Sequence, residues 1–97
     1  MKILIVDDEE NILEIVEAYL VAKNYRVFRA MDGGEALRKA ETIRPDLIVL
    51  DLMLPDISGL EVCRRIRKSS SVPVIMLTAR TTEQDILSGL QIGADHY

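Results

Sequence analysis

Short apolar runs alternate with amphipathic segments along the whole chain, and this alternation constrains its fold more than any other feature. The runs at residues 3–6, 47–50 and 72–77 are continuously apolar. Such runs are typical of strands that are buried on both faces of a sheet. Residues 25–30 instead mix apolar with charged side chains, which indicates a half-covered strand nearer an edge. The pattern therefore predicts four strands separated by helices.

The segments between these strands repeat apolar residues three and four positions apart, which is helical spacing. Each segment predicts a helix with one face turned toward the sheet. A last helix, beginning at Thr81 or Thr82 and closed by Gly93, follows the fourth strand. The positions expected to face inward are Ile12, Ile15, Val16, Tyr19 and Leu20 in the first helix, Ala36, Leu37, Ala40 and Ile43 in the second, Leu60, Cys63 and Ile66 in the third, and Ile86, Leu87 and Leu90 in the last.

Polar residues mark where two of these helices begin. Asp32 followed by Glu35, and Ser58 followed by Glu61, have the spacing of a capping box. In that motif the first side chain accepts a hydrogen bond from the backbone of the helix it precedes. Pro45 ends the second helix, because the residue before a proline is disfavoured in the helical conformation.

Strict alternation of apolar strands and helices predicts an α/β fold, in which a doubly wound parallel sheet carries helices on both faces. A chain of 97 residues has room for one domain, which we expect to span residues 1–97. In such a sheet the reactive side chains lie at the carboxyl ends of the strands.

Charge and cysteine content exclude several classes of function. Sixteen acidic and twelve basic residues give a net charge of −4, which argues against direct nucleic-acid binding by this chain. The lone cysteine, Cys63, excludes an internal disulfide and a cysteine-rich zinc site, and is expected to fill core space. No apolar run is long enough to span a membrane, and acids directly follow the first run. We expect a cytoplasmic protein without a membrane partner.

Acidic and hydroxyl side chains gather at three predicted strand ends. Asp7 and Asp8 follow the first strand, Asp51 ends the third, and Thr78 ends the fourth. If these strands are neighbours, three carboxylates and one hydroxyl converge in one crevice. Mutual repulsion should then raise at least one carboxyl pKa unless a cation is bound. Because only oxygen ligands are on offer, the pattern favours Mg²⁺, or Mn²⁺, over zinc.

A single aspartate after a strand is more often a helix cap or a solvated loop residue than a ligand, and Asp32 is interpreted as a cap. Asp7 and Asp8 could also cap the helix that begins near Glu10. Glu9 and Glu10 are interpreted as first-turn acids that the helix dipole favours. Acids at two strand ends with a threonine at a third are harder to attribute to capping, so the set favours a site.

Four segments resemble, in order and spacing, the receiver domains of bacterial two-component response regulators. They are IVDDE at residues 5–9, LDLMLP at 50–55 with Gly59, LTAR at 77–80 and GADHY at 93–97. The residues around Asp51 and Thr78 are most similar to the subfamily whose receivers precede a winged-helix DNA-binding domain. The resemblance implies a flavodoxin-like sheet with strand order 2-1-3-4-5.

The resemblance also assigns roles to the residues at the strand ends. Asp51 would be the phosphoacceptor, a carboxylate nucleophile that forms an acyl phosphate. Asp8 and Asp51 would bind Mg²⁺ directly, Asp7 through water, and the backbone carbonyl of Met53 would complete the set. Thr78 would hydrogen-bond the phosphoryl group. A sensor histidine kinase would be the donor, and the receiver would slowly lose the group without being a turnover enzyme.

A switch that regulates transcription in the full-length protein is a further implication of the resemblance. Tyr97 would be the switch aromatic, which turns inward when Thr78 moves toward the phosphate and so changes the output or dimerisation surface. Pro55 and Gly59 would shape the loop after Asp51.

The family pattern continues beyond Tyr97 with a Lys-Pro pair and a closing helix. We therefore expect a receiver truncated at its C-terminus, with the fifth strand only begun and the fifth helix absent. The run at residues 72–77 would then be an exposed edge and a template for self-association. This leaves a non-switching binding or oligomerisation module as the alternative function. A Mg²⁺-dependent phosphatase is disfavoured, because Met53 stands where such enzymes carry a second acid.

Overall fold

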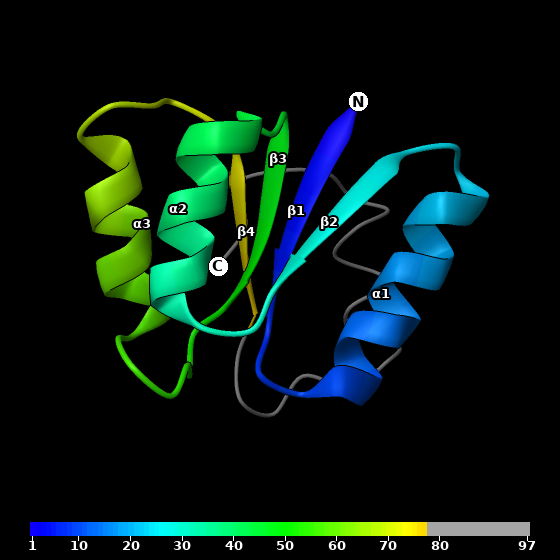
Figure 1. Cartoon of the computed structure of the whole chain (residues 1–97), viewed down its shortest axis with the longest axis horizontal. Coiled ribbons are helices and arrows are strands. Elements are labelled where there is room, and N and C mark those ends of the chain that lie inside the picture. The colour runs from blue at the N-terminus through cyan, green and yellow to red at the C-terminus, as the bar shows by residue number, and fades with distance from the viewer. Residues whose placement is uncertain (78–97) are drawn as a thin grey trace.

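The computed structural model describes residues 1–77, and their elements follow the predicted order (Figure 1). They are β1 (Lys2–Val6), α1 (Glu10–Ala22), β2 (Arg26–Ala30), α2 (Gly33–Ile43), β3 (Leu47–Asp51), α3 (Gly59–Arg67) and β4 (Val74–Leu77). The predicted helix after the fourth strand and the start of the fifth strand lie outside the described residues. Among residues 1–77, no helix is both long and apolar enough to cross a bilayer.

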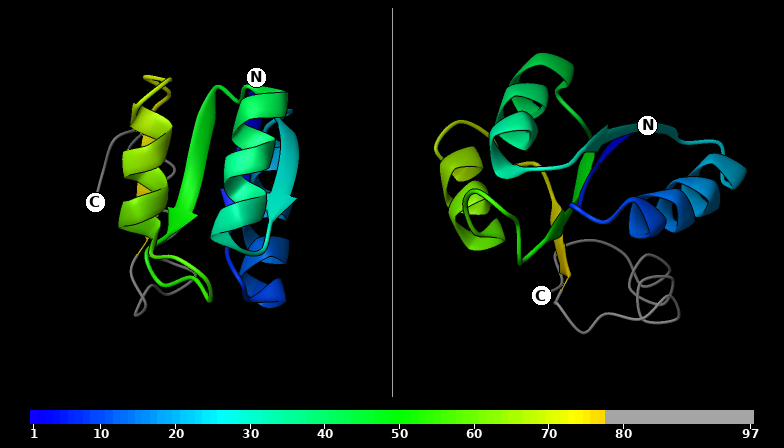
Figure 2. Two further views of the ribbon diagram at one scale, coloured as in Figure 1. Left: turned by 60° about the vertical axis from the view of Figure 1, so that its left-hand side comes forward. Right: turned by 60° about the horizontal axis from the view of Figure 1, so that its bottom comes forward.

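The four strands form one parallel sheet in the order β2-β1-β3-β4, which confirms the predicted doubly wound, flavodoxin-like arrangement. β1 lies between β2 and β3, with Ile3 opposite Val27 on one side and Leu47 on the other. Helix α1 covers one face of the sheet, and α2 and α3 lie side by side on the other (Figure 1, Figure 2). The predicted position of β2 near an edge is confirmed, since β2 is an outer strand of the described sheet.

Alternate residues of each strand enter two separate apolar cores, one on each face of the sheet. In β1, Leu4 and Val6 belong to the core under α2 and α3, whereas Ile3 and Ile5 belong to the core under α1. All four are buried, which explains why β1 has no polar alternation in its sequence. Cys63 is buried in the first of these cores, as predicted.

The predicted inward face of α3 is wrong at one position. Leu60 is 58% exposed, whereas Val62, which is absent from the predicted set, is 0% exposed. The buried residues of α3 are Gly59, Val62, Cys63 and Ile66, which recur at intervals of three, one and three. Leu60, Cys63 and Ile66 are each three residues apart. Because a turn takes about 3.6 residues, a repeat of three drifts around the helix. Cys63 and Ile66 lie on the buried face with Val62, and Leu60 is therefore turned away from it toward solvent.

Helix α1 buries one residue that is missing from the predicted set. Its buried residues are Leu13, Val16 and Leu20, which are spaced three and four apart. Of the predicted positions that are not fully buried, Ile12 and Tyr19 pack against the margin of the same core. The predicted amphipathic face is therefore correct in direction, but it extends further on one side, to include Leu13.

The predicted helix starts are confirmed by their hydrogen bonds. Asp32 accepts a hydrogen bond from the backbone N–H of Glu35 at 2.7 Å. Ser58 accepts one from the backbone N–H of Glu61 at 3.2 Å. Each bond satisfies one of the donors that a helix leaves without an internal partner in its first turn.

The predicted end of α2 is confirmed as well. The helix ends at Ile43, and Arg44 takes a left-handed conformation with φ of 53° and ψ of 66° directly before Pro45. The backbone N–H of Arg44 donates to the carbonyl of Ala40 at 3.2 Å. A left-handed backbone carries a steric cost for any L-residue with a β-carbon.

Interactions of Arg29 join the outer strand β2 to helices on both faces of the sheet. The guanidinium pairs with Glu17 and, at 2.7 Å, with Glu10, both on α1. The backbone carbonyl accepts a hydrogen bond from the ammonium of Lys39 on α2, which also pairs with Glu35 at 3.0 Å. This cluster fixes β2 between the two helical layers.

Candidate functional site

Three aspartates meet at the carboxyl edge of the sheet. Asp7 directly follows β1, Asp8 is the next residue, and Asp51 is the last residue of β3. One carboxylate oxygen from each lies within 4.8 Å of the others. The structure thus brings these three predicted residues together. Thr78 and Tyr97, the predicted phosphate and switch residues, lie outside the described residues.

Strand register brings Asp7 and Asp51 to the same level. Val6 of β1 is opposite Leu50 of β3, so the next residue of each strand reaches the same edge of the sheet. The backbone N–H of Asp7 also donates to the carbonyl of Ala30 in β2 at 3.1 Å. The spacing of the two carboxylates is therefore set by main-chain pairing.

Burial perturbs the acidity of Asp7. Asp7 and Asp51 are the buried charged residues among residues 1–77, with exposed fractions of 7% and 8%. Burial raises the pKa of Asp7 from 3.8 to about 6, and the negative charges of Asp51 and Asp8 add to the rise. The backbone N–H of Glu9, which donates to Oδ1 of Asp7 at 2.8 Å, opposes it.

The same physics acts on Asp51. Burial is the largest cause that raises the pKa of Asp51, and the charges of Asp8 and Glu9 contribute. The backbone N–H of Met53 donates to Oδ1 of Asp51 at 3.1 Å and opposes the rise. The predicted direction of the pKa change is correct for these two acids. Its larger cause is burial rather than the predicted repulsion.

The ligand atoms of this cluster suit a hard divalent cation. Asp7, Asp8 and Asp51 offer carboxylate oxygens only, which Mg²⁺ and Mn²⁺ prefer and zinc does not. A bound cation would favour the ionised carboxylates that burial disfavours. The three aspartates could therefore hold Mg²⁺. Met53 is joined to the cluster through its N–H bond to Asp51.

The chain returns to Asp51 at the start of α3. The backbone N–H of Gly59 donates to the carbonyl of Leu52 at 2.8 Å. A β-carbon on Gly59 would lie 2.3 Å from the backbone oxygen of Asp51, a separation that real contacts essentially never show. Only glycine lets α3 begin directly beside Asp51, which gives a physical reason for the loop-shaping role expected of Gly59.

Asp56 has no role in the sequence-based predictions, yet it caps a helix far away in the sequence. Its Oδ1 and Oδ2 accept hydrogen bonds from the backbone N–H groups of Gly33 and Gly34, each at 2.8 Å. These bonds lower the pKa of Asp56 to about 2. The partners are 23 and 22 residues apart, so no local sequence pattern signals the contact.

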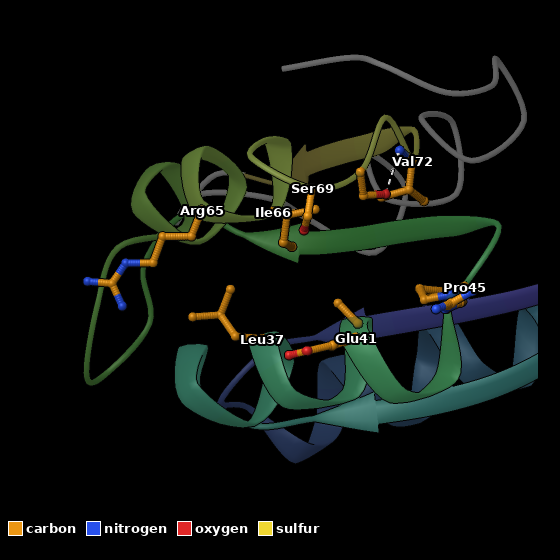
Figure 3. Close-up of a pocket in the computed structure, with 10 residues that line it drawn as sticks. Leu37, Glu41, Pro45, Arg65, Ile66, Ser69 and Val72 are labelled. Carbon is orange, nitrogen blue, oxygen red and sulfur yellow. Dashed lines mark hydrogen bonds between the residues drawn. The ribbon is translucent and has the colours of Figure 1, made fainter.

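A hollow of about 650 Å³ lies between α2 and α3, away from the aspartates (Figure 3). Leu37 and Glu41 line it from α2, and Ile66 lines it from α3. Pro45 and Val72 also line it, and they precede β3 and β4. The hollow therefore lies toward the amino ends of the strands and does not contribute to the aspartate cluster.

Comparison with known proteins gives a consistent assignment. The family model described as the response regulator receiver domain matches residues 3–97. The chain is 52% identical over 97 residues to the alkaline phosphatase synthesis transcriptional regulatory protein PhoP of Bacillus subtilis. It is 50% identical over 96 residues to the regulatory protein VanR of Enterococcus faecium. Each match covers 99% of this chain, which spans 40% of the length of PhoP and 42% of that of VanR.

Solved structures share the fold. The BeF3-activated N-terminal receiver domain of Klebsiella pneumoniae RstA matches with a TM-score of 0.81 and 30% identity, over 100% of this chain and 83% of that one. The chemotaxis response regulator CheY4 of Vibrio cholerae matches with a TM-score of 0.80 and 36% identity, over 98% and 82%. The fold, the aspartate cluster and the family match thus agree.

Proposed function

The chain belongs to the response regulator receiver domains, and from that premise we propose that Asp51 accepts a phosphoryl group from a sensor histidine kinase in a Mg²⁺-dependent reaction. The observation that carries the proposal is the buried carboxylate of Asp51 at the end of β3, with oxygens of Asp7 and Asp8 within 4.8 Å. Acids placed in this way combine a nucleophile with a cation site.

The transfer is a displacement at phosphorus. A carboxylate oxygen of Asp51 attacks the phosphorus atom of the donor phosphohistidine. A P–O bond forms as the P–N bond breaks, and the histidine nitrogen leaves with the electron pair and takes up a proton from solvent. The N–H of Met53, 3.1 Å from Oδ1 of Asp51, fixes the direction in which the nucleophile is presented.

The cation would be held by oxygen atoms alone. Asp8 and Asp51 would bind it directly, Asp7 through water, and Met53 through its backbone carbonyl. When bound, Mg²⁺ supplies positive charge that offsets repulsion between the carboxylates and the phosphoryl oxygens. The burial of Asp7 and Asp51 supports this assignment, because buried anions require compensating charge.

Phosphorylation would change an output or dimerisation surface through Thr78 and Tyr97, the switch residues that the family resemblance implies. In the full-length protein the output would be regulation of transcription, the role that the name of PhoP states for that relative. The receiver would hold the phosphoryl group and lose it slowly by hydrolysis, without turnover of a substrate. This role implies a cytoplasmic location, with the sensor kinase as partner.

Intact-mass spectrometry after incubation with Mg²⁺ and a small acyl phosphate tests the proposal. The wild-type chain should gain one phosphoryl group, and chelation of Mg²⁺ should prevent the gain. Asp51→Asn should gain none. Asp46→Asn, which neutralises an exposed acid before β3 at the opposite edge of the sheet, should behave like wild type. An unchanged wild-type mass, or an equal gain in Asp51→Asn, contradicts the proposal.

Light scattering separates the switch from the alternative of a binding module. Self-association through residues 72–77 stays a prediction. A folded chain that associates but takes up no phosphoryl group would favour the non-switching module. Association that changes when Asp51 is phosphorylated, or when beryllofluoride is bound, would favour the switch.

A further inference from the structure

The loop between β3 and α3, residues 52–58, is attached to α2 as well as to its own flanking elements. Both carboxylate oxygens of Asp56 accept hydrogen bonds from α2, one from the N–H of Gly33 and one from the N–H of Gly34, each at 2.8 Å. These N–H groups lie in the first turn of α2, where a helix has no internal acceptors for its donors. A side chain from a distant loop thus completes the start of the helix.

Apolar packing joins the same two segments at Gly33. A β-carbon on Gly33 would lie 2.4 Å from Cγ1 of Ile57 and 2.9 Å from Cγ2 of Val62. A β-carbon on Gly34 would meet its nearest neighbours at 3.5 Å, which is ordinary contact. The side chain of Ile57 therefore rests on the backbone of Gly33, whereas a methyl group at Gly34 would make only ordinary contacts, with the side chains of Asp32, Arg38 and Asp56.

Both ends of this loop are tied to the residues around Asp51. At the start of the loop, the N–H of Met53 donates to Oδ1 of Asp51 at 3.1 Å. After its last residue, the N–H of Gly59 donates to the carbonyl of Leu52 at 2.8 Å. Because α2 holds the middle of the loop, a shift of the start of α2 would reach the groups that orient Asp51.

We propose that the contact of Asp56 and Ile57 with the backbone of Gly33 and Gly34 positions the phosphorylation site, because it holds the loop that orients Asp51. The proposal rests on the proposed function for the role of the site, but the contact does not depend on phosphorylation. Asp56 acts through the loop and is a positioning residue. By thermodynamic reciprocity, a cation or phosphoryl group at Asp51 should in turn stabilise the start of α2.

In this proposal Asp56 acts on the site through its hydrogen bonds, which hold the loop in place, rather than through its charge. The charges that raise the pKa of Asp51 are those of Asp8 and Glu9. Asp56→Asn and Asp56→Ala remove the same charge, but asparagine keeps one carbonyl oxygen that can accept a helix N–H. A positioning role therefore predicts that Asp56→Asn retains more function than Asp56→Ala.

Two matched pairs of variants separate positioning from stability. Asp56→Ala and Asp32→Ala each remove an acid that caps α2, but Asp32 bonds to Glu35 within the helix's own first turn. Gly33→Ala and Gly34→Ala each add one methyl group to that turn, but only the methyl group of Gly33→Ala would clash with Ile57. The free energy of unfolding of each variant, measured with urea, shows how much of any effect follows stability alone.

Three properties of each variant are measured in the full chain. The first is the position of the NMR amide resonances of Met53 and Gly59 without metal. Mg²⁺ alone is then titrated, and phosphorylation by a small acyl phosphate is followed by intact mass. Asp56→Ala and Gly33→Ala should shift the Met53 resonance. They should also raise the half-saturating Mg²⁺ concentration about 10-fold and slow phosphorylation to a similar degree, as expected for groups that orient ligands. Asp32→Ala and Gly34→Ala should leave all three readouts near wild type.

Equal effects within each pair, or effects that track the free energy of unfolding, would overturn the proposal. So would equal Mg²⁺ affinities of Asp56→Asn and Asp56→Ala. If the wild-type chain neither binds Mg²⁺ nor takes up a phosphoryl group, the proposed function fails instead. The metal-free resonances of the Gly33→Ala and Gly34→Ala pair then decide the positioning proposal by themselves.

Discussion

The backbone N–H of Glu9 donates a hydrogen bond to Asp7 at 2.8 Å, yet the burial of Asp7 outweighs this contact and leaves its pKa at about 6. The ordinary value, which applies in the unfolded chain, is 3.8. Between these two values the folded protein holds a proton that the unfolded chain has released. The free energy of unfolding therefore falls as the pH rises through this window, and the full cost of the buried charge is present above it.

Asp7→Asn should therefore stabilise the metal-free protein. At neutral pH the free energy of unfolding should rise by about 1–3 kcal/mol, since one pKa unit is worth about 1.4 kcal/mol. The gain should shrink as the pH falls from about 6 toward about 4. Urea unfolding across this range measures it. Glu14→Gln, which neutralises an exposed acid on α1, is the control and should show no such trend. A loss of stability in Asp7→Asn at neutral pH would contradict the cost assigned to burial.

Mg²⁺ should raise the melting temperature of the wild-type protein. A cation that binds only the folded state adds about 2.7 kcal/mol when its concentration is 100 times the dissociation constant. Asp8→Asn and Asp51→Asn should remove most of this gain, whereas Asp46→Asn should keep it. Differential scanning calorimetry with and without chelator is the measurement. The same Mg²⁺ response in Asp51→Asn and in wild type would place the cation elsewhere.

Gly59→Ala should destabilise the fold and distort the site. The added methyl group would meet the backbone of Asp51, which cannot rotate away as a side chain can. Overpacking of this kind costs about 1–3 kcal/mol. Gly34→Ala, which adds the same group at the start of α2 with its nearest neighbours at 3.5 Å, an ordinary contact, is the matched control. Urea unfolding and phosphorylation of the two variants should separate them, and equal values would show that the close approach is not maintained in solution.

The buried face of α3 can be checked by truncating its apolar residues. Val62→Ala should cost about 1–3 kcal/mol, because it leaves a cavity in the core. Leu60→Ala removes more atoms but from an exposed side chain, and should change the free energy of unfolding by less than about 0.5 kcal/mol. Chemical denaturation of both variants measures this. A larger loss in Leu60→Ala would restore the inward face predicted from the sequence.

Arg44→Gly should stabilise the protein by about 0.5–1 kcal/mol, because glycine adopts the left-handed conformation at the end of α2 without steric cost. Lys23→Gly is the comparison. Lys23 follows α1 with φ of −93°, so glycine there relieves no steric cost. It adds freedom to the unfolded chain and removes the contact of the Lys23 ammonium with the Tyr19 ring, so it should destabilise. In thermal unfolding, Arg44→Gly should raise the melting temperature and Lys23→Gly should lower it.

The elements that follow from local physics were predictable. Residues 3–6 and 47–50 read as buried strands because both faces of the sheet are covered. Asp32 and Ser58 identified helix starts because a cap needs only a side chain three residues before its donor. Asp7 and Asp51 could be placed together, since parallel strands bring their carboxyl ends to one edge.

Features that depend on distant partners were not predictable. Leu60 is apolar and at a plausible spacing, but the position of α3 on the sheet decides that Val62 turns inward instead. Asp56 looks like an ordinary loop acid until the fold brings Gly33 and Gly34 to it. The dominance of burial over repulsion in the pKa of Asp51 likewise depends on how deeply the strand end lies in the fold.

The buried acids at the strand ends also bear on how such a chain evolves. Neutral residues in place of Asp7 or Asp51 would make the bare fold sturdier, and the register that pairs Val6 with Leu50 would stay intact. Selection for stability alone would favour replacement of these acids by neutral residues and would retain the sheet. If the proposed phosphorylation is what these residues do, selection for it has to offset the stability that three aspartates within 4.8 Å of one another cost the metal-free fold.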